Sequence, residues 1–271
     1  MSAHNCETCP SHAQLAQMGI TLARYDRLVA LAGNPNTGKS SVFNALTGLR
    51  QHVGNWPGKT VSRAEGGYSF NSVHYKLVDL PGTYSLLSAS QDEEISRNFL
   101  LFGRPDCTIV VADATALERN LNLIFQVMEI TSRVVVCVNL MDEARRKGIE
   151  VDVRSLSRDL GVPAVPTVAR THEGLRDLVQ TVAQVIDGSI ATSPLQPARP
   201  VEVERAIEEL APLIEARVPG VPNARWIAYR LLDGDHRIRE ALESGELAEL
   251  VASQGVAAER ASSLISIEGR Q

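Results

Sequence analysis

The chain has 271 residues, of which 44% are hydrophobic and 22% are charged, and its net charge is −5 with a pI near 5.7. This composition is ordinary for a soluble globular protein of one large or two modest domains. The acidic balance argues against a nucleic-acid partner, which needs a basic patch. No apolar run approaches the roughly 20 residues of a membrane span, and residues 1–12 are too polar for a signal peptide. We therefore expect a cytoplasmic protein.

The hydrophobic pattern predicts strands that alternate with helices. The expected strands cover residues 27–32, 61–70, 73–79, 107–113, 134–138 and 164–168, and the expected helices cover 39–48, 92–102, 117–130, 152–160 and 174–187. Residues 51–60 are rich in turn formers and predict a mobile loop. Continuous apolar strands alternating with helices predict an α/β fold, with a mostly parallel sheet covered by helices on both faces. Ligands of such sheets bind beyond the carboxyl ends of the strands.

Composition suggests five parts along the chain. They are an N-terminal extension (1–24), a nucleotide-binding domain (25–187), a Gly- and Pro-containing linker (188–200), an all-helical domain (201–266) and a short tail (267–271). In the fourth part apolar residues recur at helical spacing, and we interpret Trp226 and Tyr229 there as packing residues. The tail matches a common protease-cleavage linker and is either an engineered remnant or native.

An apolar run at 28–32 leads into Gly33-Asn34-Pro35-Asn36-Thr37-Gly38-Lys39-Ser40, and residues 41–46 after it predict a helix. Strand, G-x-x-x-x-G-K-[ST] and helix together form the context of a phosphate-binding loop. The glycines let backbone N–H groups point inward, and the helix N-terminus adds unsatisfied donors with a partial positive charge. Lys39 is expected to reach the β- and γ-phosphates, and Ser40 to bind Mg²⁺. The alternative is a strand–helix turn without function.

Asn139-x-x-Asp142 follows a predicted strand about a hundred residues later. The Asp142 carboxylate can accept two hydrogen bonds from guanine N1 and N2, whereas adenine offers no such pair of donors and would leave the carboxylate unpaired. The alternative is a surface turn. Residues 167–170 are placed like a second base-contacting loop, in which the Ala169 N–H would contact guanine O6. The sequence therefore favours GTP over ATP.

Asp79-Leu80-Pro81-Gly82 fits the pattern D-x-x-G, with Asp79 near the Mg²⁺ and the Gly82 N–H sensing the γ-phosphate. Thr60 is the candidate for a threonine that binds Mg²⁺ only when the triphosphate is present. Both segments would become ordered on GTP and relax after hydrolysis. The alternative for each is a plain turn.

The four cysteines divide into two pairs. Cys107 and Cys137 lie in apolar runs and are expected to be small buried hydrophobic residues. Four soft-metal ligands lie within nine residues of the N-terminus, namely His4, Cys6, Cys9 and His12. They predict either a metal site or a loose terminal segment with incidental thiols.

The segments GNPNTGKSS, VGNWPGKTVSR, DLPGTYSL and NLMDEA together resemble the cytosolic GTPase region of FeoB, the bacterial ferrous iron transporter family. The resemblance covers residues 27–187 closely, and residues 201–266 take the place of that family's helical domain, which resembles a GDP-dissociation inhibitor. It implies a GTPase, with GTP or GDP and Mg²⁺ bound, that regulates iron uptake at the cytoplasmic face of the inner membrane. The expected partners are the membrane permease region, which is absent from this chain, and small accessory iron-transport proteins.

The resemblance also implies a role for K⁺. Thr83 occupies the position where Ras-like GTPases carry the glutamine that orients water, and it is too short for this role. In potassium-activated GTPases an asparagine at the position of Asn36 holds K⁺ against the phosphates, completed by carbonyls of the loop that contains Gly54 and Trp56. The expected catalytic residues are Asn36, Lys39, Thr60 and Gly82, the expected Mg²⁺ ligands are Ser40, Thr60 and Asp79, and the expected K⁺ ligands are Asn36, Gly54 and Trp56.

The complete expected nucleotide-binding set is Gly33, Asn34, Pro35, Asn36, Thr37, Gly38, Lys39, Ser40, Ser41, Gly54, Asn55, Trp56, Pro57, Gly58, Lys59, Thr60, Asp79, Leu80, Pro81, Gly82, Asn139, Leu140, Met141, Asp142, Val168, Ala169 and Arg170. Two other functions remain open. One is a GTP/GDP-responsive adaptor whose hydrolysis is incidental, which the short Thr83 favours. The other is a ribosome-associated GTPase, against which the net charge of −5 counts.

Overall fold

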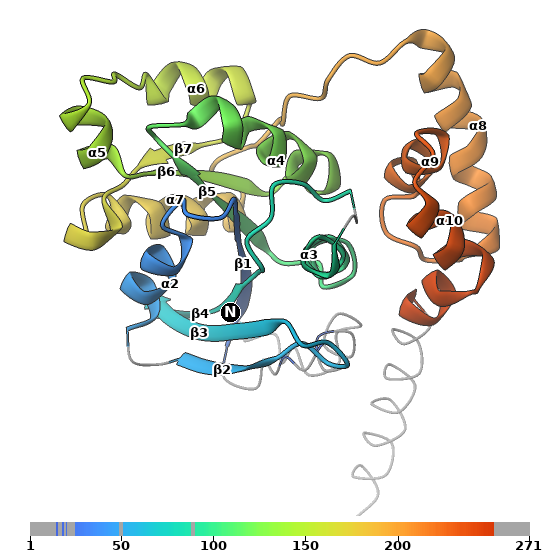
Figure 1. Ribbon diagram of the computed structural model, residues 1–271, viewed down its shortest axis with the longest axis horizontal. Helices are drawn as coiled ribbons and strands as arrows, with labels where there is room; N and C mark the ends of the chain where they lie inside the picture. Colours follow the sequence, from blue (N-terminus) through green and yellow to red (C-terminus); the bar gives the residue numbers. More distant parts are fainter. Residues whose placement is uncertain are drawn as a thin grey trace, which may run out of the picture. The chain divides into compact units, whose positions relative to one another are not determined.

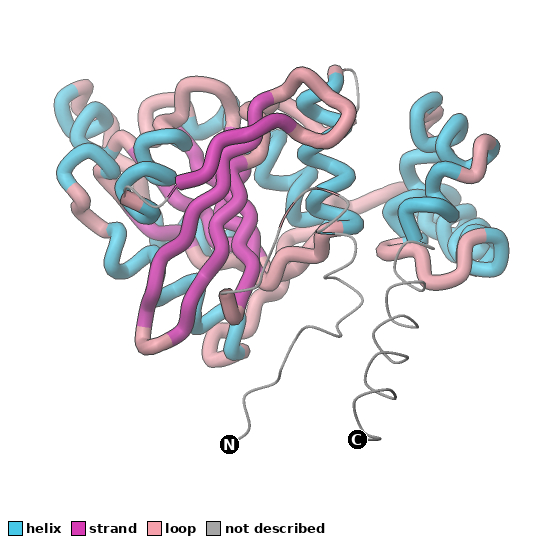
Figure 2. Tube along the Cα trace, turned by 90° about the horizontal axis from the view of Figure 1, so that it is seen from below, coloured by secondary structure: helices cyan, strands magenta, loops and turns pink. Residues whose placement is uncertain are grey.

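The computed structural model describes residues 15, 18, 20, 25–48, 51–87 and 90–251. The chain forms two compact units. One comprises Arg24–Leu100 and Pro105–Gln196, and the other comprises Met1–Ala23, Leu101–Arg104 and Pro197–Gln271. Figure 2 shows that the described strands all belong to the first unit and that the described part of the second contains only helices and loops. In the described part of the chain, no helix combines the length and the apolar character that a bilayer crossing requires.

The first unit is built on a seven-stranded sheet in the order β2-β3-β4-β1-β5-β6-β7. In chain order its strands are β1 (Arg27–Gly33), β2 (Gln51–Asn55), β3 (Ser62–Phe70), β4 (Val73–Asp79), β5 (Cys107–Asp113), β6 (Val134–Asn139) and β7 (Ala164–Pro166). The pairs β1–β4, β1–β5, β5–β6 and β6–β7 are parallel, whereas β2–β3 and β3–β4 are antiparallel. The predicted mostly parallel sheet is therefore confirmed (Figure 1).

The register of the sheet brings the predicted motifs to one edge. Leu31 is opposite Asp79, two residues before β1 ends at Gly33, and Asp113 at the end of β5 is opposite Asn139 at the end of β6. Because parallel strands point the same way, their carboxyl ends meet at the same edge of the sheet, where ligands of such folds bind. The phosphate loop, D-x-x-G and N-x-x-D all leave the sheet there.

Helices cover the sheet on both faces. The helices that begin in the first unit are α2 (Lys39–Thr47), α3 (Gln91–Phe102), α4 (Leu117–Ile130), α5 (Met141–Arg146), α6 (Val153–Leu160) and α7 (Leu175–Asp187). α2 and α7 share one core cluster with alternate residues of β1 and β5, whereas α4 contacts β5 and β6 without joining that cluster. Alternate side chains of a strand point to opposite faces, so β5 and β6, which are buried almost throughout, are covered by helices on both faces. Cys107 and Cys137 are buried in these strands, as predicted.

Residues 51–60 differ from the predicted mobile loop. Residues 51–55 form strand β2, which pairs with residues 62–66 of β3, and a turn covers residues 57–60. The local pattern was misleading because Gly54 and Asn55 favour turns, whereas the pairing with β3 satisfies their backbone groups at a distance in sequence. A short helix that was not predicted, α5, follows Asn139 and begins after Leu140, whose φ of 63° is left-handed.

The described part of the second unit contains α8 (Val201–Arg217), α9 (Ala224–Leu232) and α10 (His236–Glu243), and residues 246–251 are also helical. Ile207, Ala211 and Ile214 are buried on one face of α8, which contacts α9. Trp226 is buried on α9, and the Arg199 guanidinium lies 4.4 Å from the centre of the Tyr229 ring. Both aromatic residues therefore serve in packing, as predicted.

Asp235 holds the turn between α9 and α10. Its carboxylate accepts hydrogen bonds from the Ile238 N–H at 3.1 Å, which caps α10, and from Nε and Nη2 of the buried Arg230, each at 3.2 Å. Asp235→Ala removes the buried partner of Arg230 and leaves this buried guanidinium only the half-exposed Asp233 carboxylate, at 2.7 Å. Loss of this buried partner and of the helix cap together is expected to lower the free energy of unfolding by about 3 kcal/mol.

Asp152→Ala is the matched control. Asp152 caps α6 through the Ser155 N–H at 2.9 Å in the same way, but it is exposed and has no buried arginine beside it. Only the capping contribution of about 1 kcal/mol is expected to be lost. Urea denaturation followed by circular dichroism measures both variants, and equal losses would contradict the role assigned to the Arg230 pair.

Candidate nucleotide-binding site

The phosphate loop runs from the buried end of β1 to α2. Thr37 Oγ1 donates to Asn34 O at 2.9 Å across the loop, and Asn36 adopts a left-handed φ of 67°. Gly38 caps α2 with φ 79° and without a side-chain hydrogen bond. The first N–H groups of α2 are therefore left for a ligand. Such a helix N-terminus binds anions through its donors and its dipole.

Lys39 and Asp79 come together in the structure. The Lys39 Nζ pairs with Asp79 Oδ1, and their side chains retain only 10% and 16% of their exposure. Burial raises the pKa of Asp79, and the Lys39 charge opposes this rise. The sequence predicts a phosphate contact for Lys39 and an Mg²⁺ contact for Asp79. The two opposite charges neutralise each other, because each would otherwise be buried alone.

The segment after β4 lies against the phosphate loop. The Leu80 N–H donates to Leu31 O at 2.9 Å, and the Thr83 N–H donates to Gly33 O at 3.3 Å. A Cβ built on Gly82 would lie 3.5 Å from Pro35 Cα, so the D-x-x-G glycine lies next to the phosphate loop. Thr83 itself is only 5% exposed.

Asn139, at the end of β6, connects two loops. Its Nδ2 donates to Thr37 O of the phosphate loop at 3.0 Å, and its Oδ1 accepts from the Ala169 N–H at 3.1 Å and from Thr167 Oγ1 at 3.3 Å. The Ala169 N–H, which was predicted to contact guanine O6, is bonded to Asn139 in this structure. Thr167, the first residue of the predicted loop 167–170, is fully buried, and no contact was predicted for its side chain. Asn139 therefore fixes residues 167–170, the base-side loop, relative to the phosphate loop.

Asp142 lies at the start of α5 with 29% of its side chain exposed, and it pairs with Arg170 Nη2 at 3.0 Å. Arg170 is 79% exposed, so this pair is weak and open to exchange with a ligand. Leu140 and Met141 are half-buried beside Asp142, and Val168 is buried. Asp142 therefore offers a partly exposed carboxylate that can accept two hydrogen bonds.

The remaining predicted segment, residues 54–60, contacts α3. Trp56 is buried, and its ring packs edge-on against Phe99 at 5.7 Å. Lys59 pairs with Glu94 at 3.3 Å, and Thr60 is exposed. Among the described hydrogen bonds and ion pairs, none joins this segment to the phosphate loop. The structure brings together the other predicted segments but not this one.

The predicted ligands His4, Cys6, Cys9 and His12 lie outside the described residues. Within the ranges that the structure describes, no three histidine, cysteine or acidic side chains are grouped as a metal site.

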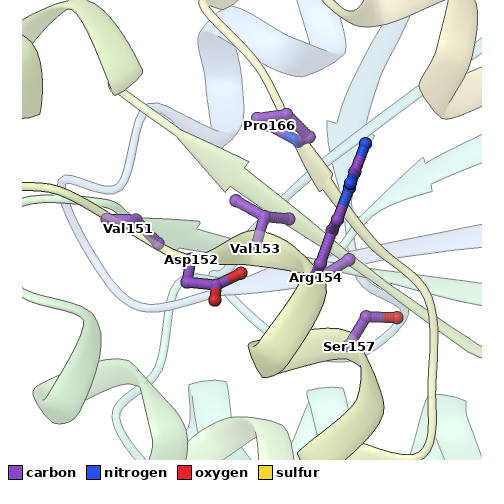
Figure 3. Close-up of a pocket in the computed structure, with 7 residues that line it drawn as sticks. Val151, Asp152, Val153, Arg154, Ser157 and Pro166 are labelled. Atoms are coloured by element: carbon purple, nitrogen blue, oxygen red, sulfur yellow. The ribbon is translucent and has the colours of Figure 1, made fainter.

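A separate depression of about 590 Å³ lies beside α6 and β7, and Val151, Asp152, Val153, Arg154, Ser157, Ala164 and Pro166 line it (Figure 3). None of these residues belongs to the predicted site, and Asp152 is already used to cap α6. This depression is therefore distinct from the nucleotide-binding edge.

A parallel sheet that carries a phosphate loop, D-x-x-G and N-x-x-D at its carboxyl edge defines a P-loop GTPase, here followed by a helical unit. Residues 27–182 match the family described as ferrous iron transport protein B, and residues 200–264 match the FeoB cytosolic helical domain. The chain belongs to the FeoB family.

Relatives and solved structures support this assignment. The chain is 41% identical over 211 residues to the Fe(2+) transport protein A/Fe(2+) transporter FeoB fusion protein of Porphyromonas gingivalis, covering 76% of this chain and 25% of the relative. It is 38% identical over 214 residues to the Fe(2+) transporter FeoB of Escherichia coli K12, covering 76% and 27%. This chain thus spans about a quarter of the length of these curated relatives.

Among solved structures, the cytosolic domain of T. maritima FeoB in apo form superimposes with a TM-score of 0.73 at 33% identity, covering 86% of this chain and 96% of that chain. The cytosolic domain of L. pneumophila FeoB gives 0.73 at 32% identity, covering 88% and 98%. The T. maritima domain has also been solved in GDP and GMPPNP forms.

Proposed function

We propose that this chain is the GTP-driven switch of a ferrous iron transporter. It binds GTP or GDP with Mg²⁺, hydrolyses GTP slowly, and regulates iron passage through a permease region at the cytoplasmic face of the inner membrane. The observation that carries the proposal is the link made by Asn139 between the phosphate loop and the base-side loop. The P. gingivalis relative, named as a fusion with Fe(2+) transport protein A, supports a small accessory protein as partner.

The residues at the phosphate edge fit Mg²⁺, which prefers oxygen ligands. Ser40 is exposed at the start of α2, and Asp79 supplies a carboxylate beside Lys39. Lys39 would leave Asp79 for the phosphates, which frees the carboxylate for the metal side. Thr60 would join once residues 54–60 move toward the loop. Bound Mg²⁺ would neutralise negative charge on the phosphates.

Asn36 carries the proposed K⁺ assistance. It is exposed in the phosphate loop, and its side-chain oxygen is a suitable ligand for a monovalent cation. Gly54 is paired with Arg63, and Trp56 O accepts from the Lys59 N–H at 3.0 Å, so these carbonyls would have to leave the β2–β3 hairpin first. K⁺ supplies positive charge where the transition state becomes more negative. The buried Thr83 cannot orient water, so hydrolysis without the cation is slow.

GTP turnover is expected to be at least about tenfold faster in K⁺ than in Na⁺, the lower end of what one aligned positive charge contributes. Asn36→Ala is expected to remove this difference. Asn71→Ala is the control, because Asn71 is also exposed with a left-handed φ, of 48°, but lies in the β3–β4 turn. Phosphate release at equal nucleotide saturation measures the rates. Equal rates in the two salts would remove the K⁺ role and leave the GTPase itself in place.

The burial of Thr83 also favours a second candidate, a GTP/GDP-responsive adaptor whose hydrolysis is incidental. A single-turnover assay in K⁺ separates the two. Turnover faster than GDP release supports the switch, and the absence of turnover with retained nucleotide binding supports the adaptor.

A further inference from the structure

The segment that follows D-x-x-G lies along one face of α4. Asn122 Nδ2 donates to Tyr84 O at 3.3 Å, and Gln126 Oε1 accepts from the Leu86 N–H at 2.6 Å. Gln126 Nε2 donates to Asn122 Oδ1 at 3.4 Å, so the two amides orient each other. Because a backbone N–H can only donate, Gln126 has to present its oxygen to Leu86, and the orientation of both amides follows from the network.

Arg119 lies one turn earlier on the same face of α4, at the i, i+3, i+7 spacing that aligns side chains on a helix. Its guanidinium lies 4.5 Å from the centre of the Tyr84 ring. Its carbonyl accepts from Nδ2 of Asn34, a phosphate-loop residue that is 3% exposed, at 3.3 Å. α4 therefore contacts both the phosphate loop and the segment 84–86.

Gly82 lies between these attachments. Before it in the chain, the Leu80 N–H donates to Leu31 O at 2.9 Å, and directly after it the Thr83 N–H donates to Gly33 O at 3.3 Å. Tyr84 and Leu86, two and four residues after Gly82, are bonded to α4. A backbone fixed on both sides loses less conformational entropy when it binds a ligand. The γ-phosphate is the part of GTP that a D-x-x-G glycine contacts, and GDP lacks it.

We propose that Asn122 and Gln126 are positioning residues for the γ-phosphate. They hold residues 84–86 so that the Gly82 N–H stays in place beside the phosphate loop, and they thereby favour the triphosphate over the diphosphate. Neither residue touches the nucleotide. This inference rests on the proposed GTP-binding function and deepens it, since it names what sets the response to the third phosphate.

Gln126→Met tests the proposal, because methionine has a similar length and no acceptor for Leu86. Dissociation constants are measured by calorimetry with Mg²⁺ for GDP and for a non-hydrolysable GTP analogue. We expect the analogue to bind about three- to tenfold more weakly while GDP stays within about twofold, since one hydrogen bond contributes on this scale. Gln126→Glu keeps an acceptor oxygen. It is expected to restore most of the parent's ratio between the dissociation constants for GDP and for the GTP analogue. If Gln126→Met does not fold, Asn122→Ala, at an exposed position, removes the bond to Tyr84 instead.

Gln180→Met is the matched control, since Gln180 is exposed on α7 and its side chain makes no hydrogen bond among the described residues. An unchanged ratio in Gln126→Met, an equal weakening of both nucleotides, or tighter binding of the analogue would each overturn the inference while leaving the proposed function intact. A parent chain that binds neither nucleotide would overturn the proposed function and, with it, this inference.

Discussion

Gly38→Ala is expected to abolish measurable nucleotide binding and to destabilise the first unit. A Cβ at this position would lie 2.4 Å from Asn139 Nδ2, the atom that donates to Thr37 O. Relief of the clash requires Asn139 to move, and the same side chain holds Ala169. The variant would therefore disturb the phosphate loop and the base-side loop together. Loss of stability of about 3 kcal/mol is expected, from left-handed strain and overpacking combined.

Gly188→Ala separates these two causes. Gly188 ends α7 with φ 80°, almost the same as the 79° of Gly38, but a Cβ there would meet nothing within 4 Å. Only the strain of about 1 to 2 kcal/mol applies, with nucleotide binding unchanged. Thermal unfolding and calorimetric titration with GDP measure both variants. Equal behaviour of the two would show that the contact with Asn139 contributes nothing.

The phosphate loop could be predicted from sequence because its function depends on local features. Gly38, Lys39 and Ser40 stand at fixed spacing after an apolar strand, and the geometry of a strand–loop–helix turn follows from these few residues. The strands β5 and β6 could be predicted equally well, because each is a nearly continuous apolar run that ends in a polar residue. Their alternation with helices sufficed to predict the mostly parallel sheet.

What could not be predicted depends on contacts between distant segments. β2 forms because residues 51–55 pair with β3, although Gly54 and Asn55 locally favour a turn. The pair formed by Lys39 and Asp79 arises from β1–β4 adjacency together with the burial of both groups. The connecting role of Asn139 involves residues 102 and 30 positions away in the chain. A motif identifies which residues matter, and the three-dimensional contacts decide what each one holds.

Asp142→Asn is expected to weaken GDP binding by about two orders of magnitude, because two charge-assisted hydrogen bonds to guanine N1 and N2 become one neutral bond and one mismatch. Loss of the existing pair with Arg170 at 3.0 Å adds little, since Arg170 is 79% exposed. Asparagine can accept from N1 and donate to a carbonyl at position 2. Xanthine carries that carbonyl where guanine carries an amine, so xanthosine diphosphate is expected to bind the variant more tightly than the parent.

Glu143→Gln is the control for this prediction, because it makes the same carboxylate-to-amide change on the next residue of α5, where the side chain is 41% exposed and paired with Arg146. It is expected to leave both nucleotides unaffected. Calorimetric titration of GDP and xanthosine diphosphate into each variant, with Mg²⁺ present, measures the affinity for each nucleotide. A simple loss of GDP affinity would also follow from a disturbed α5. Only the gain in affinity for xanthosine diphosphate requires the carboxylate to face the edge of the base. If a folded Asp142→Asn variant shows no such gain, guanine is recognised elsewhere in the chain.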